Sequence, residues 1–178
     1  MWLSILILAA VTLERGVELV IAGRNTRRLK AAGGFEVAAG HYPLIVGLHA
    51  VWLAALWALA WDRPAQPVLL ALFLLLQAAR IWVLVTLGPR WTTRIIIVPG
   101  ESLVRRGPYR FVDHPNYLVV VGEIALLPLV FGLAEIALLF SLLNALVLAL
   151  RIRAEDTALG RRSDPGQSQG TMRSDGNV

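Results

Sequence analysis

The chain has 178 residues, of which 57% are hydrophobic and only 16% are charged. Soluble domains carry about 45–50% apolar and about 25% charged residues, so this composition excludes a disordered chain and argues against a soluble globular domain. Cysteine is absent, which excludes disulfides, thiolate metal sites and cysteine nucleophiles, and we expect no metal site. The formal net charge is +5 and comes almost wholly from arginine, as is typical of the cytoplasmic loops of membrane proteins.

Four long apolar regions follow one another along the chain, at residues 1–22, 42–61, 68–87 and 117–150. A membrane-spanning helix needs about 20 residues, so the fourth region is too long for one helix. Gly132 and Glu135 interrupt it near its middle. We therefore predict an all-α integral membrane protein with five transmembrane helices, of which the last two form a hairpin. The first region has no basic start and no cleavage site, which predicts a retained span.

Basic residues follow the first, third and fifth predicted spans, whereas the loop at residues 62–66 has one arginine beside one aspartate. The positive-inside rule then predicts a multi-pass protein of the inner (cell) membrane with its N-terminus outside and its C-terminus in the cytoplasm. Residues 1–159 are expected to form a single membrane domain. Residues 160–178 are rich in serine, glycine, aspartate and glutamine, which predicts a disordered polar tail.

Polar side chains within the predicted spans gather in the half that faces the cytoplasm. Glu14 and Glu18 lie one turn apart in the first span, Gln77 and Arg80 share a face of the third, and Glu123 lies about two turns into the fourth. An ionisable group at membrane depth is costly, so each is a functional candidate by default. The alternative for the two glutamates of the first span is an interhelical ion pair that fixes packing.

The last span and the second add further candidates. Asn144, Arg151 and Glu155 are spaced seven and four residues apart, which places all three on one stripe of a helix. An exposed i,i+4 ion pair between Arg151 and Glu155 is the simpler interpretation. His49 stands alone in an apolar span and is expected to be a hydrogen-bonded packing residue. His41 lies at the mouth of the same span, and for this residue both a functional role and a packing role remain possible interpretations.

The loop before the fourth span is the densest stretch of functional residue types. Gly107-Pro108 predicts a turn, and Pro115 suits the first position of a helix because its missing N–H would be unpaired there. His114 then lies at the N-terminus of that helix, where free N–H groups can bind a carboxylate or a ribose oxygen. An amphipathic interfacial loop anchored by tyrosine and arginine is the alternative.

Three motifs in this order resemble a known family. They are Gly107-Pro108-Tyr109-Arg110, His114-Pro115-Asn116-Tyr117, and Arg151 with Glu155-Asp156 after an apolar hairpin. Together they are similar to the isoprenylcysteine carboxyl methyltransferase family, integral membrane enzymes that use S-adenosylmethionine. The resemblance covers roughly residues 87–159. The N-terminal half resembles a bacterial branch encoded beside type III polyketide synthases, which is associated with O-methylation of alkylresorcinols and alkylpyrones.

The resemblance implies a cofactor pocket on the cytoplasmic side, closed by the loop before the hairpin. The positions that match the cofactor contacts of the family are Glu101, Leu103, Val104, Tyr109, His114, Pro115, Tyr117 and Glu155. Arg151 matches an arginine on the substrate side. Two positions depart from the family pattern. Asp113 stands where an arginine usually precedes the histidine, which reverses the local charge, and Asp156 stands in place of a glutamate.

Methyl transfer from a sulfonium requires positioning more than activation. A carboxylate acceptor needs no base, whereas a phenol with a pKa of about 10 benefits from a base or from a cation that stabilises the phenolate. Arg151 is the candidate for the cation, and His41, Glu14 and Glu18 are candidate bases.

The sequence therefore predicts an S-adenosylmethionine-dependent membrane O-methyltransferase. We expect its acceptor to be lipophilic and to enter from the bilayer, membrane lipid to surround the protein, and nucleic acid to play no part. An alkylresorcinol or alkylpyrone is the first choice of acceptor. The enzymatic alternatives are an isoprenylcysteine carboxyl methyltransferase and a phospholipid N-methyltransferase, and the alternative without activity is a helical membrane scaffold.

Overall fold

The computed structural model describes residues 2–37, 39–102 and 104–160. The side chains of His41 and of residues 154–160 are not among those described. The predicted disordered tail falls, apart from Gly160, outside these ranges, as does Leu103.

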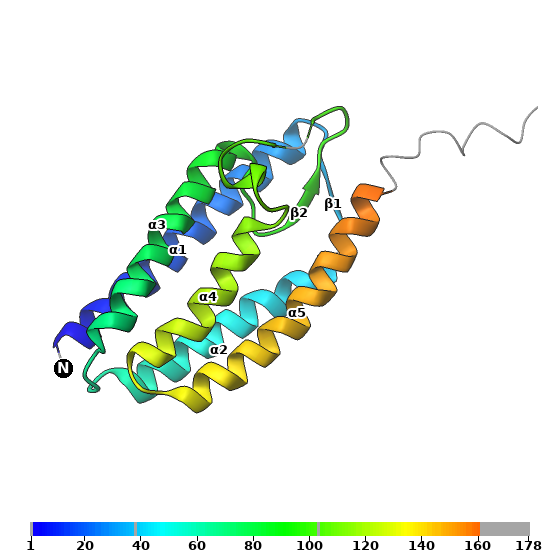
Figure 1. The fold of residues 1–178 in the computed structure, drawn as a ribbon. Coiled ribbons are helices and arrows are strands. Elements are labelled where there is room, and N and C mark those ends of the chain that lie inside the picture. Colours follow the sequence, from blue (N-terminus) through cyan, green and yellow to red (C-terminus); the bar gives the residue numbers. More distant parts are fainter. Residues whose placement is uncertain (1, 38, 103, 161–178) are drawn as a thin grey trace, which may run out of the picture.

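The described chain forms a bundle of long helices (Figure 1). These are α1 (Trp2–Ala31), α2 (Tyr42–Ala60), α3 (Pro67–Leu87), α4 (Pro115–Val130) and α5 (Ala134–Gly160), with short 3-10 helices η1 (Ala39–His41), η2 (Gly88–Arg90) and η3 (Gly107–Arg110). We call the end of the bundle that holds residues 32–41 and 88–114 the loop end. The α2–α3 and α4–α5 turns lie at the opposite end.

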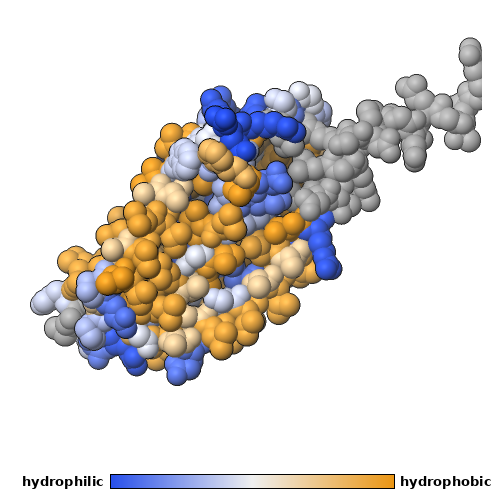
Figure 2. Space-filling view, in the orientation of Figure 1, coloured by the Kyte–Doolittle hydropathy of each residue, from blue (hydrophilic) through white to orange (hydrophobic). Residues whose placement is uncertain are grey.

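The outer surface of the bundle is apolar. Figure 2 shows hydrophobic residues covering the flanks of the helices and hydrophilic residues gathered toward the two ends. Within the described residues, three helices are long and apolar enough to cross a membrane, at Tyr42–Ala60, Pro67–Arg90 and Ala134–Arg153. The chain is therefore built as a membrane protein. Helix α4 is shorter and α1 carries charges in its middle, so the five-span topology stays a prediction.

Two helices extend well past the ends of their apolar regions. Helix α1 continues beyond Ala22 to Ala31, and α5 continues beyond Leu150 to Gly160. The added segments are rich in arginine and also contain alanine and leucine, all good helix formers. The end of an apolar run thus marks a change of surroundings rather than the end of a helix.

The prediction of an all-α protein missed a small sheet at the loop end. Strand β1 (Phe35–Val37) pairs antiparallel with β2 (Ile95–Ile97), with Glu36 opposite Ile96. Three successive isoleucines favour a strand, but the partner strand lies about sixty residues earlier in the chain. The pairing fastens the loop after α1 to the loop after α3.

The predicted break in the fourth apolar region is confirmed. Helix α4 ends at Val130, and Gly132 has φ +69°, a left-handed conformation that glycine adopts without strain. The backbone N–H of Gln66 donates to the carbonyl of Val130 over 2.8 Å and so joins the two turns at the opposite end. The core packs near this end, among Leu8, Trp52, Leu56, Phe73, Leu127 and Val130.

Candidate functional site

Two cavities lie on either side of a shared wall. The first, which we call the loop cavity, has a volume of about 710 Å³ and lies among residues 87–117 at the loop end, with Leu29 and Arg151. The second, the helix cavity, has a volume of about 320 Å³ and lies among α1, α2, α4 and α5 below it. The residues that line both are Trp91, Thr92, Asn116, Tyr117 and Arg151. The two cavities therefore meet at these five side chains.

The loop cavity depends on a close contact between η3 and α3. Gly107 has φ +57°, and a Cβ placed there would lie 2.5 Å from the hydroxyl oxygen of Thr86. Only glycine fits such a position. Arg106 adds a hydrogen bond from Nη2 to the carbonyl of Thr86, over 3.3 Å. The Gly107-Pro108 turn thus fixes Tyr109 and Arg110 in the cavity wall.

The His-Pro-Asn-Tyr motif forms the start of α4. Pro115 occupies the first helical position and is buried, and the carbonyl of His114 accepts hydrogen bonds from the N–H groups of Tyr117 and Leu118. The rings of His114 and Tyr117 are stacked, with centroids 5.1 Å apart and planes 18° apart. Both side chains line the loop cavity, where they present a flat aromatic surface.

The segment after α3 closes the wall between the cavities. Asn25 of α1 donates from Nδ2 to the carbonyls of Gly88 and Trp91, over 3.2 and 2.8 Å. Trp91 is 3% exposed. Its Nε1 and the Oδ1 of Asn116 are buried and have no hydrogen-bond partner in the described protein. Buried polar groups are seldom left unpaired, so the shared wall is suited to a polar ligand.

Arg151 lies in this wall, and its partners among the described residues are neutral. Its Nε donates to the hydroxyl of Tyr117 over 2.8 Å, and its Nη1 donates to the backbone carbonyl of Thr93 over 2.7 Å. No ion pair links Arg151 to any described carboxylate, and Nη2 has no partner among the described residues. Within the described part of the chain, the N–H donors at Nη2 are therefore available to a ligand.

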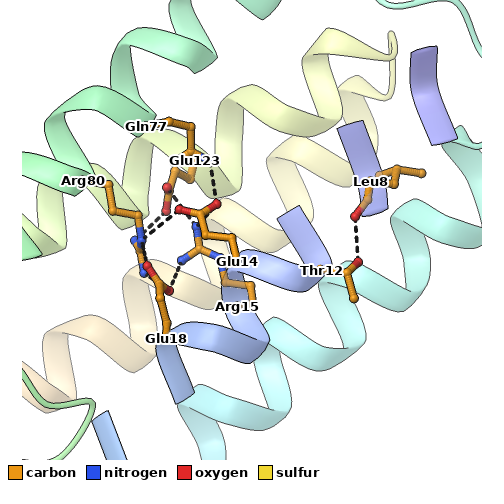
Figure 3. A network of polar contacts seen from close by, with 8 residues as sticks. All are labelled: Leu8, Thr12, Glu14, Arg15, Glu18, Gln77, Arg80 and Glu123. Atoms are coloured by element: carbon orange, nitrogen blue, oxygen red, sulfur yellow. Dashed lines mark hydrogen bonds and ion pairs between the residues drawn. The ribbon is translucent and has the colours of Figure 1, made fainter. Parts of the chain in front are cut away.

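A cluster of charges is buried between α1, α3 and α4 (Figure 3). We call Glu14, Arg15, Glu18, Arg80 and Glu123 the charge cluster. Arg80 donates to both oxygens of Glu18 and, over 2.8 Å, to Glu123. Arg15 lies 3.0 Å from an oxygen of Glu18 and 3.0 Å from one of Glu123. These ion pairs join three helices, although the Nε of Arg15 is buried without a partner among the described residues, and they fix the packing of the helices.

The two glutamates proposed as bases belong to this cluster. Glu18 lines the helix cavity, but both of its oxygens accept from guanidinium groups. Glu14 lines neither cavity and accepts from Gln77 over 3.0 Å. The carboxylate oxygens of both residues are thus engaged by neighbouring side chains of the protein. The arrangement favours the ion-pair interpretation for both residues, and a role as base stays a prediction that these contacts do not support.

The other predicted site residues fall into three groups. Five of the eight cofactor candidates line the loop cavity, namely Glu101, Val104, Tyr109, His114 and Tyr117. Pro115 shapes the helix start without lining the cavity. Leu103 and the side chains of Glu155 and His41 lie outside the described residues, so their roles stay predictions. Asp113, the departure from the family pattern, also lines the loop cavity.

Two residues of the shared wall, Trp91 and Asn116, are not among the site residues predicted from the sequence. Trp91 and Asn116 have unpartnered polar atoms in the shared wall, and a tryptophan near a predicted span end looks the same in sequence as an interfacial anchor. Asn144 was on the expected stripe with Arg151, and both line the helix cavity. The seven-residue spacing was the pattern that identified this stripe.

Glu36 forms two ion pairs that support the loop end. Glu36 of β1 accepts from Lys30 over 2.7 Å and from Arg94 over 2.5 Å. These two cations hold the pKa of Glu36 below its ordinary value, with Lys30 contributing most, against the opposing effect of partial burial. The guanidinium of Arg94 also lies 3.9 Å from the ring centre of Tyr42. Glu36 therefore connects α1 and the small sheet to the start of α2.

Comparisons with known proteins give a consistent result. Residues 69–161 match the model of the isoprenylcysteine carboxyl methyltransferase (ICMT) family. The chain is 39% identical over 159 residues to the uncharacterized protein YpbQ of Bacillus subtilis, which covers 86% of this chain and 95% of that protein. It is 27% identical over 158 residues to an uncharacterized protein of Haemophilus influenzae, covering 85% and 91%. No solved structure matches the chain significantly.

Proposed function

The chain belongs to the isoprenylcysteine carboxyl methyltransferase family of membrane methyltransferases, and from this premise we propose that it transfers a methyl group from S-adenosylmethionine to an oxygen of a lipophilic acceptor. The observation that carries the proposal is the meeting of a polar cavity and an apolar cavity at Arg151. A methyl donor and a methyl acceptor need such a shared boundary, because the reacting atoms must approach to about 3 Å.

The loop cavity suits the cofactor. Its volume of about 710 Å³ lies within the ordinary range for ligand pockets. Asp113 supplies a carboxylate for the positively charged parts of the cofactor, and so does Glu101, which also forms an exposed ion pair with Arg90 over 3.1 Å. The stacked rings of His114 and Tyr117 supply a flat surface for its base. The unpartnered Nε1 of Trp91 is a further donor at the inner end. S-adenosylmethionine, when bound, supplies a methyl group already activated for transfer.

The helix cavity suits the acceptor. Apolar side chains of α1, α2 and α5 form most of its wall, including Leu19, Leu53 and Val147. An acceptor with a long hydrocarbon part would gain about 25 cal/mol for each Å² of apolar surface buried there. The two cavities thus separate a water-soluble donor from a lipid-soluble acceptor and keep water from the reacting atoms.

Arg151 has the central role in the proposed reaction. The hydroxyl of Tyr117 and the carbonyl of Thr93 hold its guanidinium in a fixed orientation, so the free N–H groups at Nη2 are positioned before an acceptor arrives. An oxyanion bound there would be stabilised without reorganisation of the site. No described carboxylate competes for this charge.

An alkylresorcinol or alkylpyrone remains our first choice of acceptor. The carboxylate of an isoprenylated cysteine is the second candidate, because it fits the family name and would also pair with Arg151. We further propose that the loop end faces the cytoplasm, since it holds most of the arginines, that α1 and α4 cross the membrane as well, and that the N-terminus lies outside.

Cofactor binding is tested by calorimetry with S-adenosylhomocysteine on protein purified in detergent. The wild type should bind, and His114→Ala should weaken binding about tenfold through loss of the stacked surface and of polar contacts in the loop cavity. Arg28→Ala is the matched control, because Arg28 is an exposed α1 residue that lines neither cavity. A folded wild type that does not bind would refute the proposal.

Topology is tested with single cysteines, since the chain has none of its own. A cysteine introduced at Arg105 of the loop end should be labelled by an impermeant maleimide only after the cells are opened. A cysteine at Asp62, in the α2–α3 turn, should be labelled in intact cells. Labelling with the opposite pattern would reverse the orientation.

A further inference from the structure

The helix cavity contains polar side chains at a depth where the rest of its wall is apolar. They come from three helices, with Thr12, Arg15 and Glu18 on α1, His49 on α2 and Asn144 on α5. Arg80 of α3 lies beside them. Most of these side chains already pair or hydrogen-bond with other side chains, so a ligand can bind only to those with a donor or acceptor that is still available.

When the side chains that bond to other side chains within the protein are set aside, His49 and Asn144 remain as candidates. Arg15, Glu18 and Arg80 pair within the charge cluster. The hydroxyl of Thr12 donates to the carbonyl of Leu8 over 2.7 Å and accepts from Trp57 over 3.0 Å. The sequence places Asn144 on one stripe with Arg151, but it predicts only a packing role for His49.

Asn144 is buried, with 4% of its surface exposed, and its amide forms no hydrogen bond with any described residue. Asn144 lines the helix cavity. Neither its amide nitrogen nor its amide oxygen is among the fully buried atoms that lack a hydrogen-bond partner in the described protein. The amide therefore opens onto the cavity. It offers both an N–H donor and a carbonyl acceptor there.

His49 offers a lone pair at the same cavity. Its Nδ1 lies 2.8 Å from the carbonyl of Ile45, and because a carbonyl can only accept, Nδ1 must carry the proton. The neutral ring then has a lone pair on Nε2, which has no partner among the described residues and is not sealed. The edge contact with Trp52, 6.5 Å between ring centres, holds the ring in place.

The two residues lie at a similar depth below the shared wall. Asn144 precedes Arg151 by seven residues, and His49 follows Tyr42 by seven, so each lies about 10 Å along its helix from the loop end. Helices α2 and α5 pack against each other, and both side chains line the same cavity between them. Side chains tilt toward the start of their own helix, and α2 begins toward the loop end, so the imidazole leans toward the shared wall.

We propose that His49 and Asn144 form a polar subsite in the helix cavity that binds a hydroxyl group on the body of the acceptor, separate from the oxygen that is methylated at Arg151. A hydroxyl donates to Nε2 of His49 while it accepts from the amide of Asn144. An ether or ester oxygen cannot donate, so it leaves Nε2 unpaired and is selected against. The inference rests on the proposed function, because it assigns the helix cavity to the acceptor.

The test compares two probes that differ by one hydroxyl, a 5-alkylresorcinol and the 3-alkylphenol with the same alkyl chain. Methyl transfer from labelled S-adenosylmethionine gives KM and kcat for each. The wild type should show a KM for the phenol about tenfold above that for the resorcinol. Equal KM values in the wild type would overturn the proposal.

Substitution then assigns the difference. His49→Leu and Asn144→Leu should each raise the KM of the resorcinol about tenfold and leave the KM of the phenol within about twofold, with kcat little changed. His49→Gln, which keeps a hydrogen-bonding group near the position of Nε2, should restore part of the preference. Val147→Ala is the matched control, because it removes only apolar wall and should shift both probes by the same factor.

Equal losses for both probes in His49→Leu would show that His49 only packs, and would overturn the proposal. If His49→Leu fails to bind S-adenosylhomocysteine, and so has not folded, the Asn144→Leu and His49→Gln variants give the same comparison. If neither probe is methylated although the cofactor analogue binds, the proposed acceptor fails. Equilibrium binding of labelled probes then still decides the subsite, which is refuted if the resorcinol and the phenol bind equally.

Discussion

Arg80 and Arg151 are both arginines on long helices beside the helix cavity, yet their surroundings are opposite. Arg80 is 5% exposed and is bound by the carboxylates of Glu18 and Glu123. Arg151 is bound by a phenol hydroxyl and a backbone carbonyl, and among described residues by no carboxylate. A buried charge compensated within the protein stabilises helix packing, whereas a charge beside a cavity that no described carboxylate compensates is available to a ligand.

The largest effect should follow from removing the guanidinium of Arg80 from the charge cluster. Arg80→Met should destabilise the protein by about 3–5 kcal/mol, because Glu18 and Glu123 would remain buried without a major partner. Thermal unfolding in detergent, followed by tryptophan fluorescence, measures the loss. Adding Glu18→Gln and Glu123→Gln should recover much of it, since the uncompensated charges are then gone. An unchanged midpoint in Arg80→Met would contradict a structural role for the cluster.

A smaller effect should follow from loosening Arg151. Tyr117→Phe removes the hydroxyl that accepts from Nε of Arg151 while it keeps the ring stacked on His114. A hydrogen bond to a charged group is worth about 1.5–3 kcal/mol, so turnover should fall about ten- to hundredfold. Affinity for S-adenosylhomocysteine should stay within a few-fold. Initial rates and calorimetry on one preparation measure both, and a loss confined to cofactor affinity would show that Tyr117 serves only the loop cavity.

The smallest effect belongs to the exposed ion pair of Glu36. Glu36→Gln should cost about 1 kcal/mol or less at pH 7, because Lys30 is nearly half exposed and solvent screens the pair. The pKa of Glu36 is lowered in the folded protein, so its contribution is present above the unfolded pKa and is lost as the pH falls through the folded pKa. Unfolding midpoints of variant and wild type should therefore converge as the pH falls from 7 toward about 3. A gap that widens on acidification would contradict this assignment.

The sequence predicted the helices well where an apolar run and a breaker coincide, as at Gly132. It failed where the structure depends on pairing across distance. The strand at Ile95–Ile97 needs its partner at Phe35–Val37, and no local pattern links the two.

The same distinction applies to the site. The residues His114, Tyr117 and Arg151 could be found because each belongs to a short motif whose spacing can be recognised in the sequence. The sequence could not show that Glu14 and Glu18 are bound by arginines of two helices, nor that Asn144 has no hydrogen-bond partner among the described residues. Both facts depend on how α1, α3 and α5 pack, which is a property of the folded bundle.

We assign the charge of Arg151 to the acceptor rather than to the cofactor. Cofactor affinity and methyl transfer to an alkylresorcinol, measured on the same Arg151→Ala preparation, test this role most directly. We expect affinity for S-adenosylhomocysteine within a few-fold of the wild type and a collapse of turnover, with little recovery in Arg151→Lys because a point charge cannot reproduce the planar fork. Normal turnover in Arg151→Ala, or a parallel loss of cofactor affinity and stability, would contradict it.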